Sequence, residues 1–594
     1  MAFTHWRLPF LQSPLPRRRH LRVRAGRRRP AVPVKLSLEQ FEDRTLPSID
    51  VTQGFAGLAF DSRVPADLPD TILAVGPNKV VEATNRDVAF YDKITEAGTP
   101  ETPLPLKTFF APVLPGGLPV AGDIITDPKV AYDQTAGRFV LTTLELNFAT
   151  QEAHLLLGVS TSNDPTGAAA DWEMHRIDVT EPGNFADFPQ LGWDADGIYV
   201  SVNMFKFVGH LPFDHARVLA FATSSLTDGD SSTLTMSSTD FLPPNFALQP
   251  AAMFGAGSGA PMYFVESQVP GLSSGGGGFI DVVQMTNKLS ASPTFTDFKV
   301  LVPSYNHPRD ADQPGGAQLD TGDGRVLSAA WRDGRLVASQ TEQANQHAVA
   351  RWYEFGTAGG TPTLTQTFEI NRGPGVATFM PSINIAPNGD LAMTFLESSA
   401  TEFLSMYLAG QKAGAPAGTF QGSVLAKSGE ATLRVFRASG ELGAPLRTGD
   451  YSGVAIDPTD GSFWAANEYT TTATFPPPPG TRLANWGTWV AHFTISSEGA
   501  LSALALGQPA ATAGPLVLAD PITPGGTTNG GSQASLPATA LSSSSSNLTS
   551  AAAQAVGITS GTASTTALDN YFAHDQDQHQ GLDWTDGLTA AMPW

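Results

Sequence analysis

Four aspartates occupy the same place relative to successive strand-like segments, and their carboxylates could bind a cation or share protons. Each precedes a short apolar segment of strand length: Asp127, Asp187, Asp312 and Asp450. Asp70 stands at the start of another such segment. If the segments lie side by side, the carboxylates converge and either raise one another's pKa or recruit a cation. Ca²⁺ is the cofactor that such oxygens would host. The alternative is that each aspartate accepts backbone N–H bonds and shapes its own turn.

Three arginines form a second candidate set for ligand binding. Arg309, Arg372 and Arg447 each lie shortly before one of the apolar segments. Gathered on one face, they would bind the carboxylate of a sugar acid through paired N–H donors. Arginine is also common on loop surfaces, so the sequence leaves both interpretations open. It identifies no set of catalytic residues.

Several other kinds of site are excluded or lack the context that they need. The chain has no Cys, which excludes disulfides, thiol nucleophiles and Cys-ligated metals. Residues 271–275 fit the string of a nucleophile elbow, but more glycines follow where a helix is required. No apolar run of 18 residues occurs, so we expect no transmembrane span.

An internal repeat must position the candidate residues. A strand-like segment, a Gly-bearing turn and a second strand recur seven times, with starts at 69, 128, 189, 250, 314, 381 and 451. Spacings of 59 to 70 residues leave room for four strands in each copy. Few charged residues (15%), 58 Gly and 46 Pro favour many short strands joined by turns. We predict an all-β, seven-bladed β-propeller over residues 49–505, closed by pairing of 51–59 with 489–494. Two unrelated β-sandwiches are the alternative.

The two ends of the chain differ from this middle part. The first 35 residues hold ten of the 35 basic residues and none of the 56 acidic ones, so the remainder carries about −31. We predict a basic, disordered leader at 1–48. Residues 506–567 are rich in Ser, Ala and Gly and predict a flexible linker, followed by a short C-terminal element at 568–594. Because the acidic body would repel phosphate, we expect no nucleic-acid partner.

The end of the leader carries a motif. Residues 38–48 read LEQFEDRTLPS. This resembles the leader motif LExLEDRxLPS at the start of many planctomycete-type secreted and surface proteins, with Phe41 in place of the usual Leu. The resemblance implies export, with a secreted or cell-surface location and the periplasm as a variant.

A second resemblance covers roughly residues 55–230. The segments PDT at 69–71, VGPN at 75–78, Asn85 and YDK at 91–93 are similar to the opening of an uncharacterised family of bacterial secreted propeller-like proteins. Residues 161–167 with Trp172, and 188–192, match later segments of that family. The chain departs from it at Ile72 and Leu73, where the family more often has Asn-Gly. The resemblance implies fold and export but no catalytic residues.

Two classes of function remain. The first is an exported, monomeric β-propeller that binds a glycan or protein partner or has a structural role, without catalysis. The second is a glycoside-active hydrolase similar to the sialidase-type propellers, which use an arginine cluster with a Tyr–Glu pair. Glu468-Tyr469 follows the seventh repeat, but the Ser-x-Asp-x-Gly-x-Thr-Trp box of those enzymes is absent.

Overall fold

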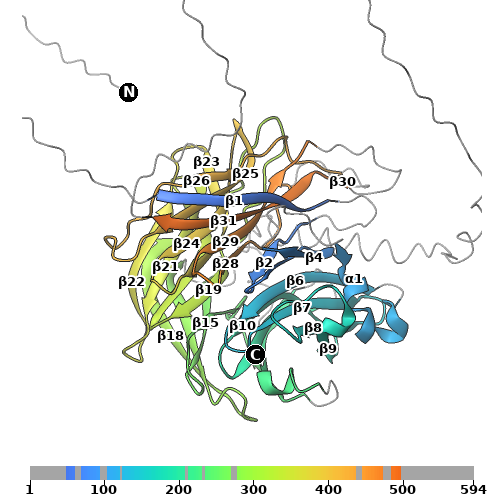
Figure 1. The fold of residues 1–594 in the computed structure, drawn as a ribbon. Coiled ribbons are helices and arrows are strands. Elements are labelled where there is room, and N and C mark those ends of the chain that lie inside the picture. Colours follow the sequence, from blue (N-terminus) through green and yellow to red (C-terminus); the bar gives the residue numbers. More distant parts are fainter. Residues whose placement is uncertain are drawn as a thin grey trace, which may run out of the picture. The chain divides into compact units, whose positions relative to one another are not determined.

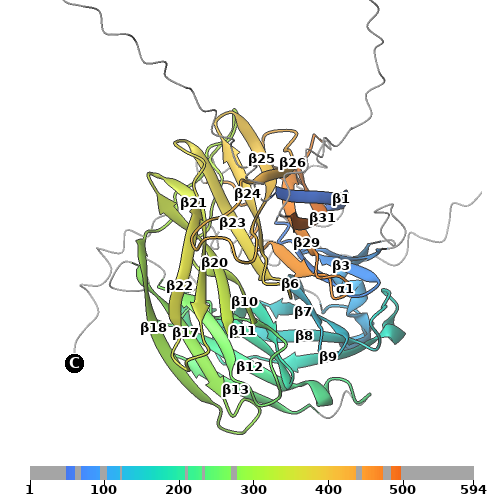
Figure 2. The same cartoon turned by 60° about the vertical axis from the view of Figure 1, so that its left-hand side comes forward.

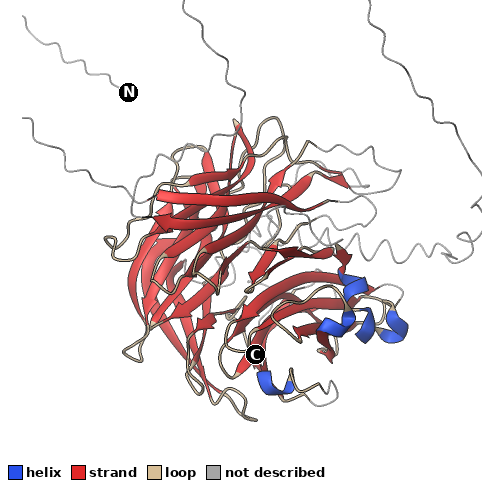
Figure 3. Ribbon diagram, viewed as in Figure 1, coloured by secondary structure: helices blue, strands red, loops and turns tan. Residues whose placement is uncertain are grey.

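A computed structural model describes residues 48–60, 68–93, 103–120, 123–207, 212–229, 234–268, 277–436, 445–472 and 483–496. The predicted leader (apart from Ser48), the linker and the C-terminal element lie outside these residues. Within the described ranges no helix is long and apolar enough to cross a membrane. Strands dominate, and helical structure is limited to short pieces such as α1 (Leu106–Phe109) (Figure 3).

Five antiparallel sheets have four strands each, and four of them are built from strands close in sequence (Figure 1). The first holds β2 (Ile72–Val75), β3 (Lys79–Ala83), β4 (Asp87–Asp92) and β5 (Leu104–Pro105). The second holds β6 (Asp123–Asp133), β7 (Arg138–Asn147), β8 (Glu152–Ser160) and β9 (Trp172–Asp178). The third holds β14 (Gln249–Pro250), β16 (Met262–Ser267), β17 (Gly277–Thr286) and β18 (Thr294–Tyr305). The fourth holds β23 (Val376–Ile385), β24 (Leu391–Ser399), β25 (Glu402–Gln411) and β26 (Val424–Lys427). The fifth holds β28 (Gly453–Ile456), β29 (Phe463–Thr470), β31 (Trp486–Ser496) and β1 (Ser48–Ala59).

A nine-stranded sheet holds two further runs of four strands, seen side by side with their neighbours in Figure 2. One run is β10 (Asn184–Trp193), β11 (Gly197–Lys206), β12 (Phe213–Ala222) and β13 (Met236–Phe241). The other is β19 (Val326–Arg332), β20 (Arg335–Ala344), β21 (His347–Gly356) and β22 (Thr363–Ile370). The short strand β15 (Ala252–Phe254) links them through parallel pairing with β10 and β19. A separate pair is formed by β27 (Val435–Phe436) and β30 (Leu483–Ala484).

The all-β class and the β-propeller arrangement are confirmed. Five separate four-stranded sheets form blades, and the expected number of seven depends on how the nine-stranded sheet is divided. The predicted closure is also confirmed: β1 pairs with β31, with Val51 opposite Phe493 and Phe55 opposite Val490. Figure 1 shows these two strands, one from each end of the described chain, side by side. Closure removes two exposed sheet edges.

Burial explains why the middle strands of the sheets read as almost continuous apolar runs. Every residue of β24 is buried, as is every residue of β8 after Glu152, because each sheet packs against a neighbour on both faces. The outer strand β13 instead alternates exposed and half-buried residues, the pattern of a strand with one free face.

The predicted fifth repeat is wrong in its position. The sequence places its first strand at 313–320, but the inner strand there is β19, which begins at Val326. Residues 311–319 make only isolated bridges, of Ala311 with Leu319 and of Leu319 with Leu446. The Gln-Pro-Gly-Gly string at 313–316 imitates the start of a repeat but belongs to a loop.

Candidate functional site

A strained residue lies either just before the inner strand of a sheet or inside that strand, where its pairing register shifts. Five such residues are not glycine and have positive φ: Asp70 (+45°), Asp127 (+58°), Phe188 (+52°), Ala247 (+55°) and Met380 (+47°). This conformation costs about 1 kcal/mol or more for a residue with a side chain, so other contacts must hold it. The preceding sheet supplies them. Asn85 Oδ1 accepts the Asp127 N–H at 2.7 Å, and Asn203 Oδ1 accepts the Ala247 N–H at 2.9 Å.

Two aspartates take part in a hydrogen-bonded chain that crosses four consecutive sheets. Asp70 Oδ1 accepts the Asp450 N–H at 2.6 Å, and Asp70 Oδ2 accepts the Asn85 side-chain amide. Asn85 in turn holds Asp127, whose Oδ2 accepts the Phe188 N–H at 3.1 Å. Asp70 is fully buried and Asp127 is 9% exposed. These aspartates therefore accept backbone N–H bonds, but from the neighbouring sheet rather than from their own turn.

The carboxylates also act on one another. Burial, then the charges of Asp187 and Asp450, raise the pKa of Asp127 to about 8. Burial, followed by Asp450 and Asp127, raises the pKa of Asp70 well above its usual range. Asp70, Asp127, Asp187 and Asp450 thus form one group, which we call the acidic cluster. Three of the four predicted aspartates belong to it.

Two basic side chains lie beside the acidic cluster, and the sequence predicted only one of them. Arg447, one of the predicted arginines, is buried and forms an ion pair with Asp450. Lys129 was not predicted. It is 5% exposed, and its Nζ lies 3.3 Å from the centroid of the Tyr451 ring. Burial lowers the pKa of Lys129 to about 7, although Asp70, Asp127 and Asp450 oppose that shift.

Sequence reasoning also gave no role here to Glu468 and Tyr451. Glu468, on β29, is 2% exposed, and neither of its carboxylate oxygens has a hydrogen-bond partner. Burial, followed by the charges of Asp70 and Asp450, raises the pKa of Glu468 well above its usual range. The buried Tyr451 hydroxyl is likewise without a partner. The sequence had named Glu468 only as the neighbour of Tyr469 after the seventh repeat, and Tyr451 only as the start of that repeat.

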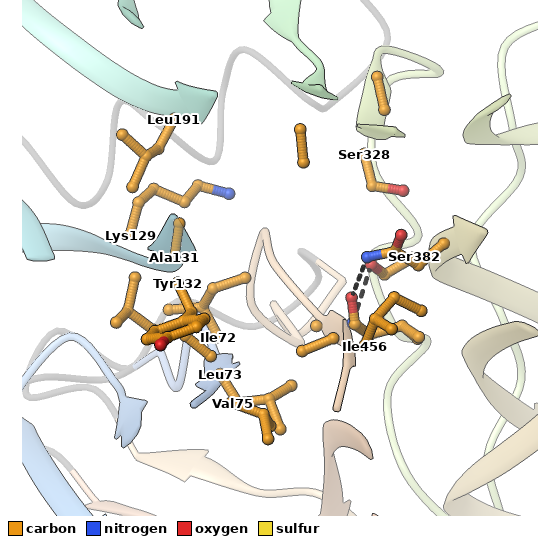
Figure 4. A pocket seen from close by; sticks show the side chains of 18 of the residues that line it. Ile72, Leu73, Val75, Lys129, Ala131, Tyr132, Leu191, Ser328, Ser382 and Ile456 are labelled. Carbon is orange, nitrogen blue, oxygen red and sulfur yellow. Dashed lines mark hydrogen bonds between the residues drawn. The ribbon is translucent and has the colours of Figure 1, made fainter. Parts of the chain in front are cut away.

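A central cavity of about 110 Å³ lies among the inner strands. Residues of β2, β6, β10, β14, β15, β19, β23 and β28 line it. Apolar and polar side chains share the walls, and Figure 4 shows Ile72, Leu73, Val75 and Leu191 among the apolar ones. The amino group of Lys129 points into this space (Figure 4).

The remaining predicted residues lie elsewhere. Asp312 is exposed and accepts a bond from the Gln318 amide at 3.0 Å, outside the acidic cluster. Arg372 bonds Glu397 at 3.0 Å and lies over the Tyr407 ring. Arg309 and Asp312 line a second, polar cavity of about 390 Å³. Arg372 and Arg447 therefore pair with different acids, while Arg309 pairs with none among the described residues.

Close groups of metal-ligand atoms do not coincide with the acidic cluster. Among the described residues, three such atoms lie within 4.8 Å of one another in two places: Glu181 with His215 and Asp240, and Asp457 with Asp460 and His492. In the first group Arg217 forms ion pairs with Glu181 and Asp240, so a cation already balances those acids. In the second, Lys93 pairs with Asp457 at 2.6 Å. Among the described residues the acidic cluster does not bring three such atoms together, and the predicted Ca²⁺ ring stays a prediction.

The similarity of this chain to known proteins is distant. No protein-family model and no curated protein matches the chain. Among solved structures, a Dyadobacter fermentans protein of unknown function aligns with 62% of this chain and 95% of its own, at 11% identity and a TM-score of 0.36. A Trypanosoma rangeli sialidase bound to the inhibitor DANA aligns with 62% of this chain at 10% identity and a TM-score of 0.31. This alignment spans 54% of the sialidase, about half its length. A Penicillium chrysogenum α-L-arabinanase complexed with arabinobiose aligns with 53% of this chain and 94% of its own, at 10% identity and a TM-score of 0.28. At these scores the likeness carries no information on activity.

Proposed function

We propose that this chain is an exported, seven-bladed β-propeller that binds carbohydrate and does not cleave it. The number of blades is supported by the contacts between inner strands. β2, β6, β10, β14, β19, β23 and β28 contact one another in that order, and β28 contacts β2 again. Division of the nine-stranded sheet at β15 yields two four-stranded blades beside the other five.

Export is supported by the two sequence resemblances, to the LExLEDRxLPS leader and to the secreted propeller-like family. The absence of Cys is compatible with any compartment, so it does not decide the location. Detection of the processed chain outside the cytoplasm of a host cell would support export. Retention of the full-length chain in the cytoplasm would contradict it.

The polar cavity at Arg309 is the observation that carries the binding proposal. Its volume of about 390 Å³ falls in the range of small-molecule sites. Its walls combine guanidinium and amide donors with carboxylate acceptors: His307, Arg309, Asp310, Asp312, Gln318, Gln346 and His347. The exposed Arg309 side chain has no ion pair or hydrogen bond within the described residues. A ligand that offers several hydroxyl groups, and a carboxylate in acidic sugars, matches this set of donors and acceptors.

A glycan panel tests the proposal directly. Full-length protein is applied to immobilised neutral and acidic oligosaccharides, and positive glycans are titrated in solution. We expect a restricted set of binders, with affinity reduced at least tenfold in Arg309→Ala. Arg434→Ala, which removes an exposed arginine outside the cavity, is the control and should bind normally. Absence of binding across the panel, or unchanged binding by Arg309→Ala, would overturn the proposal.

Glycoside hydrolysis remains the second candidate because of one observation, the raised pKa of Asp127 beside other carboxylates. A protonated acid next to an ionised one is the arrangement of a general acid–base pair. However, oxygens of Asp70 and Asp127 are already bonded to backbone N–H groups of neighbouring sheets. We therefore expect no release of nitrophenol from aryl glycosides by the wild-type protein. Release that disappears in Asp127→Asn would favour the hydrolase instead.

A further inference from the structure

Two buried lysines of this protein have opposite surroundings. Lys288 is 6% exposed, and its Nζ bonds the Asp194 carboxylate, Asp196 at 2.8 Å and the Ala260 carbonyl at 2.7 Å. Such pairing is what a charged lysine needs in a protein interior. Lys129 is equally buried, yet within the described residues its amine has no hydrogen bond and no carboxylate within 4.0 Å.

The amine of Lys129 is held in position and faces open space. The Tyr451 ring lies against it, and the amine points into the central cavity (Figure 4). The lining extends from Lys129 to Gln134, past the end of β6, and includes Trp193 and Phe254 at the ends of β10 and β15. A small molecule that enters the channel therefore meets apolar side chains, uncharged polar side chains and one amine.

Two residues that line the same cavity carry polar side-chain atoms without hydrogen-bond partners. Gln190 Nε2 and Gln249 Oε1 belong to residues that line it, are almost fully buried and have no hydrogen-bond partner. They could donate to and accept from a ligand's oxygen-bearing groups. The cavity volume of about 110 Å³ restricts the ligand to a few carbon and oxygen atoms.

We propose that Lys129 is a carbonyl-capture residue, whose amine forms an imine with a small aldehyde or ketone in the central channel. The nitrogen lone pair adds to the carbonyl carbon, and the carbonyl oxygen takes up a proton to give a carbinolamine. The nitrogen loses a proton to solvent, and the hydroxyl group leaves as water with a proton from solvent. The products are one imine and one water, and no electron donor or acceptor is needed.

The surroundings of Lys129 suit the addition step of this reaction. Because burial lowers the pKa of Lys129 to about 7, half of the amines are neutral and nucleophilic at that pH. Both oxygens of Asp127 already accept hydrogen bonds, from Thr126 and Phe188, so the proton for the leaving hydroxyl comes from solvent. This site is separate from the polar cavity of the proposed carbohydrate module, and either could exist without the other.

Reductive trapping tests the proposal on the intact protein. Full-length protein is treated with propanal and sodium cyanoborohydride at pH 7 for short times, and each lysine's modification is quantified by peptide mass spectrometry. Lys107, exposed on α1, is the reference, and Lys288 is the buried, paired control. An exposed lysine of ordinary pKa is less than about one part in a thousand neutral at pH 7. We expect Lys129 to be modified at least about 50-fold faster than Lys107, and Lys288 more slowly than both.

A denatured sample separates chemistry from access. In urea the preference for Lys129 should vanish and all three lysines should react at similar rates. Tyr451→Phe, which keeps the ring but removes its hydroxyl, should retain rapid labelling of Lys129. Labelling of native Lys129 at or below the rate of Lys107 would overturn the proposal and leave Lys129 as a counter-charge to the acidic cluster.

Discussion

Replacement of Asp127 by Asn should remove one contribution to the pH dependence of the protein's free energy of unfolding. The Asp127 carboxyl group has a pKa of about 8, against an ordinary value of 3.8. Between these values the folded protein holds a proton that the unfolded chain releases. The free energy of unfolding therefore falls as pH rises from about 4 to 8. Asn is neutral throughout and keeps a side-chain oxygen that can accept the Phe188 N–H.

The size of the effect follows from linkage. Each pH unit in this window is worth about 1.4 kcal/mol, so the full interval gives an upper limit of about 6 kcal/mol. Lys129 contributes with the opposite sign above about pH 7, because its folded-state pKa is lowered to about 7 and the unfolded chain then binds the extra proton. Measurements between pH 4.5 and 7 avoid that contribution. In this range we expect Asp127→Asn to gain about 3 kcal/mol relative to the wild type.

Urea unfolding at several pH values, followed by tryptophan fluorescence, measures this difference. Asp312→Asn is the matched control, because Asp312 is exposed and lies outside the acidic cluster. Its difference from the wild type should not vary with pH by more than a few tenths of a kcal/mol. If Asp127→Asn shows an equally flat difference, Asp127 is ionised in the folded protein and the assigned proton is absent.

Three other outcomes are expected. Glu468→Gln should raise the urea midpoint at pH 8, since it removes a buried carboxylate whose oxygens have no partner, whereas the exposed Glu152→Gln should leave it unchanged. Deletion of residues 1–60 should cause aggregation in size-exclusion chromatography, because it exposes the edge of β31; a monomeric product with normal melting would contradict the role of β1 in closure. Added Ca²⁺ or chelator should not shift the melting temperature, and a rise of several degrees that is lost in Asp127→Asn with Asp450→Asn would restore the Ca²⁺ interpretation.

The repeat was predictable because every sheet requires the same pattern of residue types. An inner strand buried on both faces requires an apolar run, and the turn after it requires Gly or Asn. Those constraints leave a readable period. They say little about which copy is genuine when a loop has similar composition, and the Gln-Pro-Gly-Gly segment at 313–316 was mistaken for a repeat for that reason.

A residue joins the acidic cluster only if it lies close to the centre of the propeller. The sequence indicates this only for residues near an inner strand. Asp127 and Asp450 stand two or three positions before an inner strand's regular pairing resumes, so they reach the centre where all the sheets meet. Arg372 lies eight residues before the equivalent Met380, and Asp312 lies fourteen before β19. At those separations the side chains have other surroundings: Arg372 pairs with Glu397, and Asp312 is exposed. A shared position before a strand therefore predicts convergence only within a few residues, and the centre is completed by Lys129 and Tyr451, whose positions follow from the strand itself.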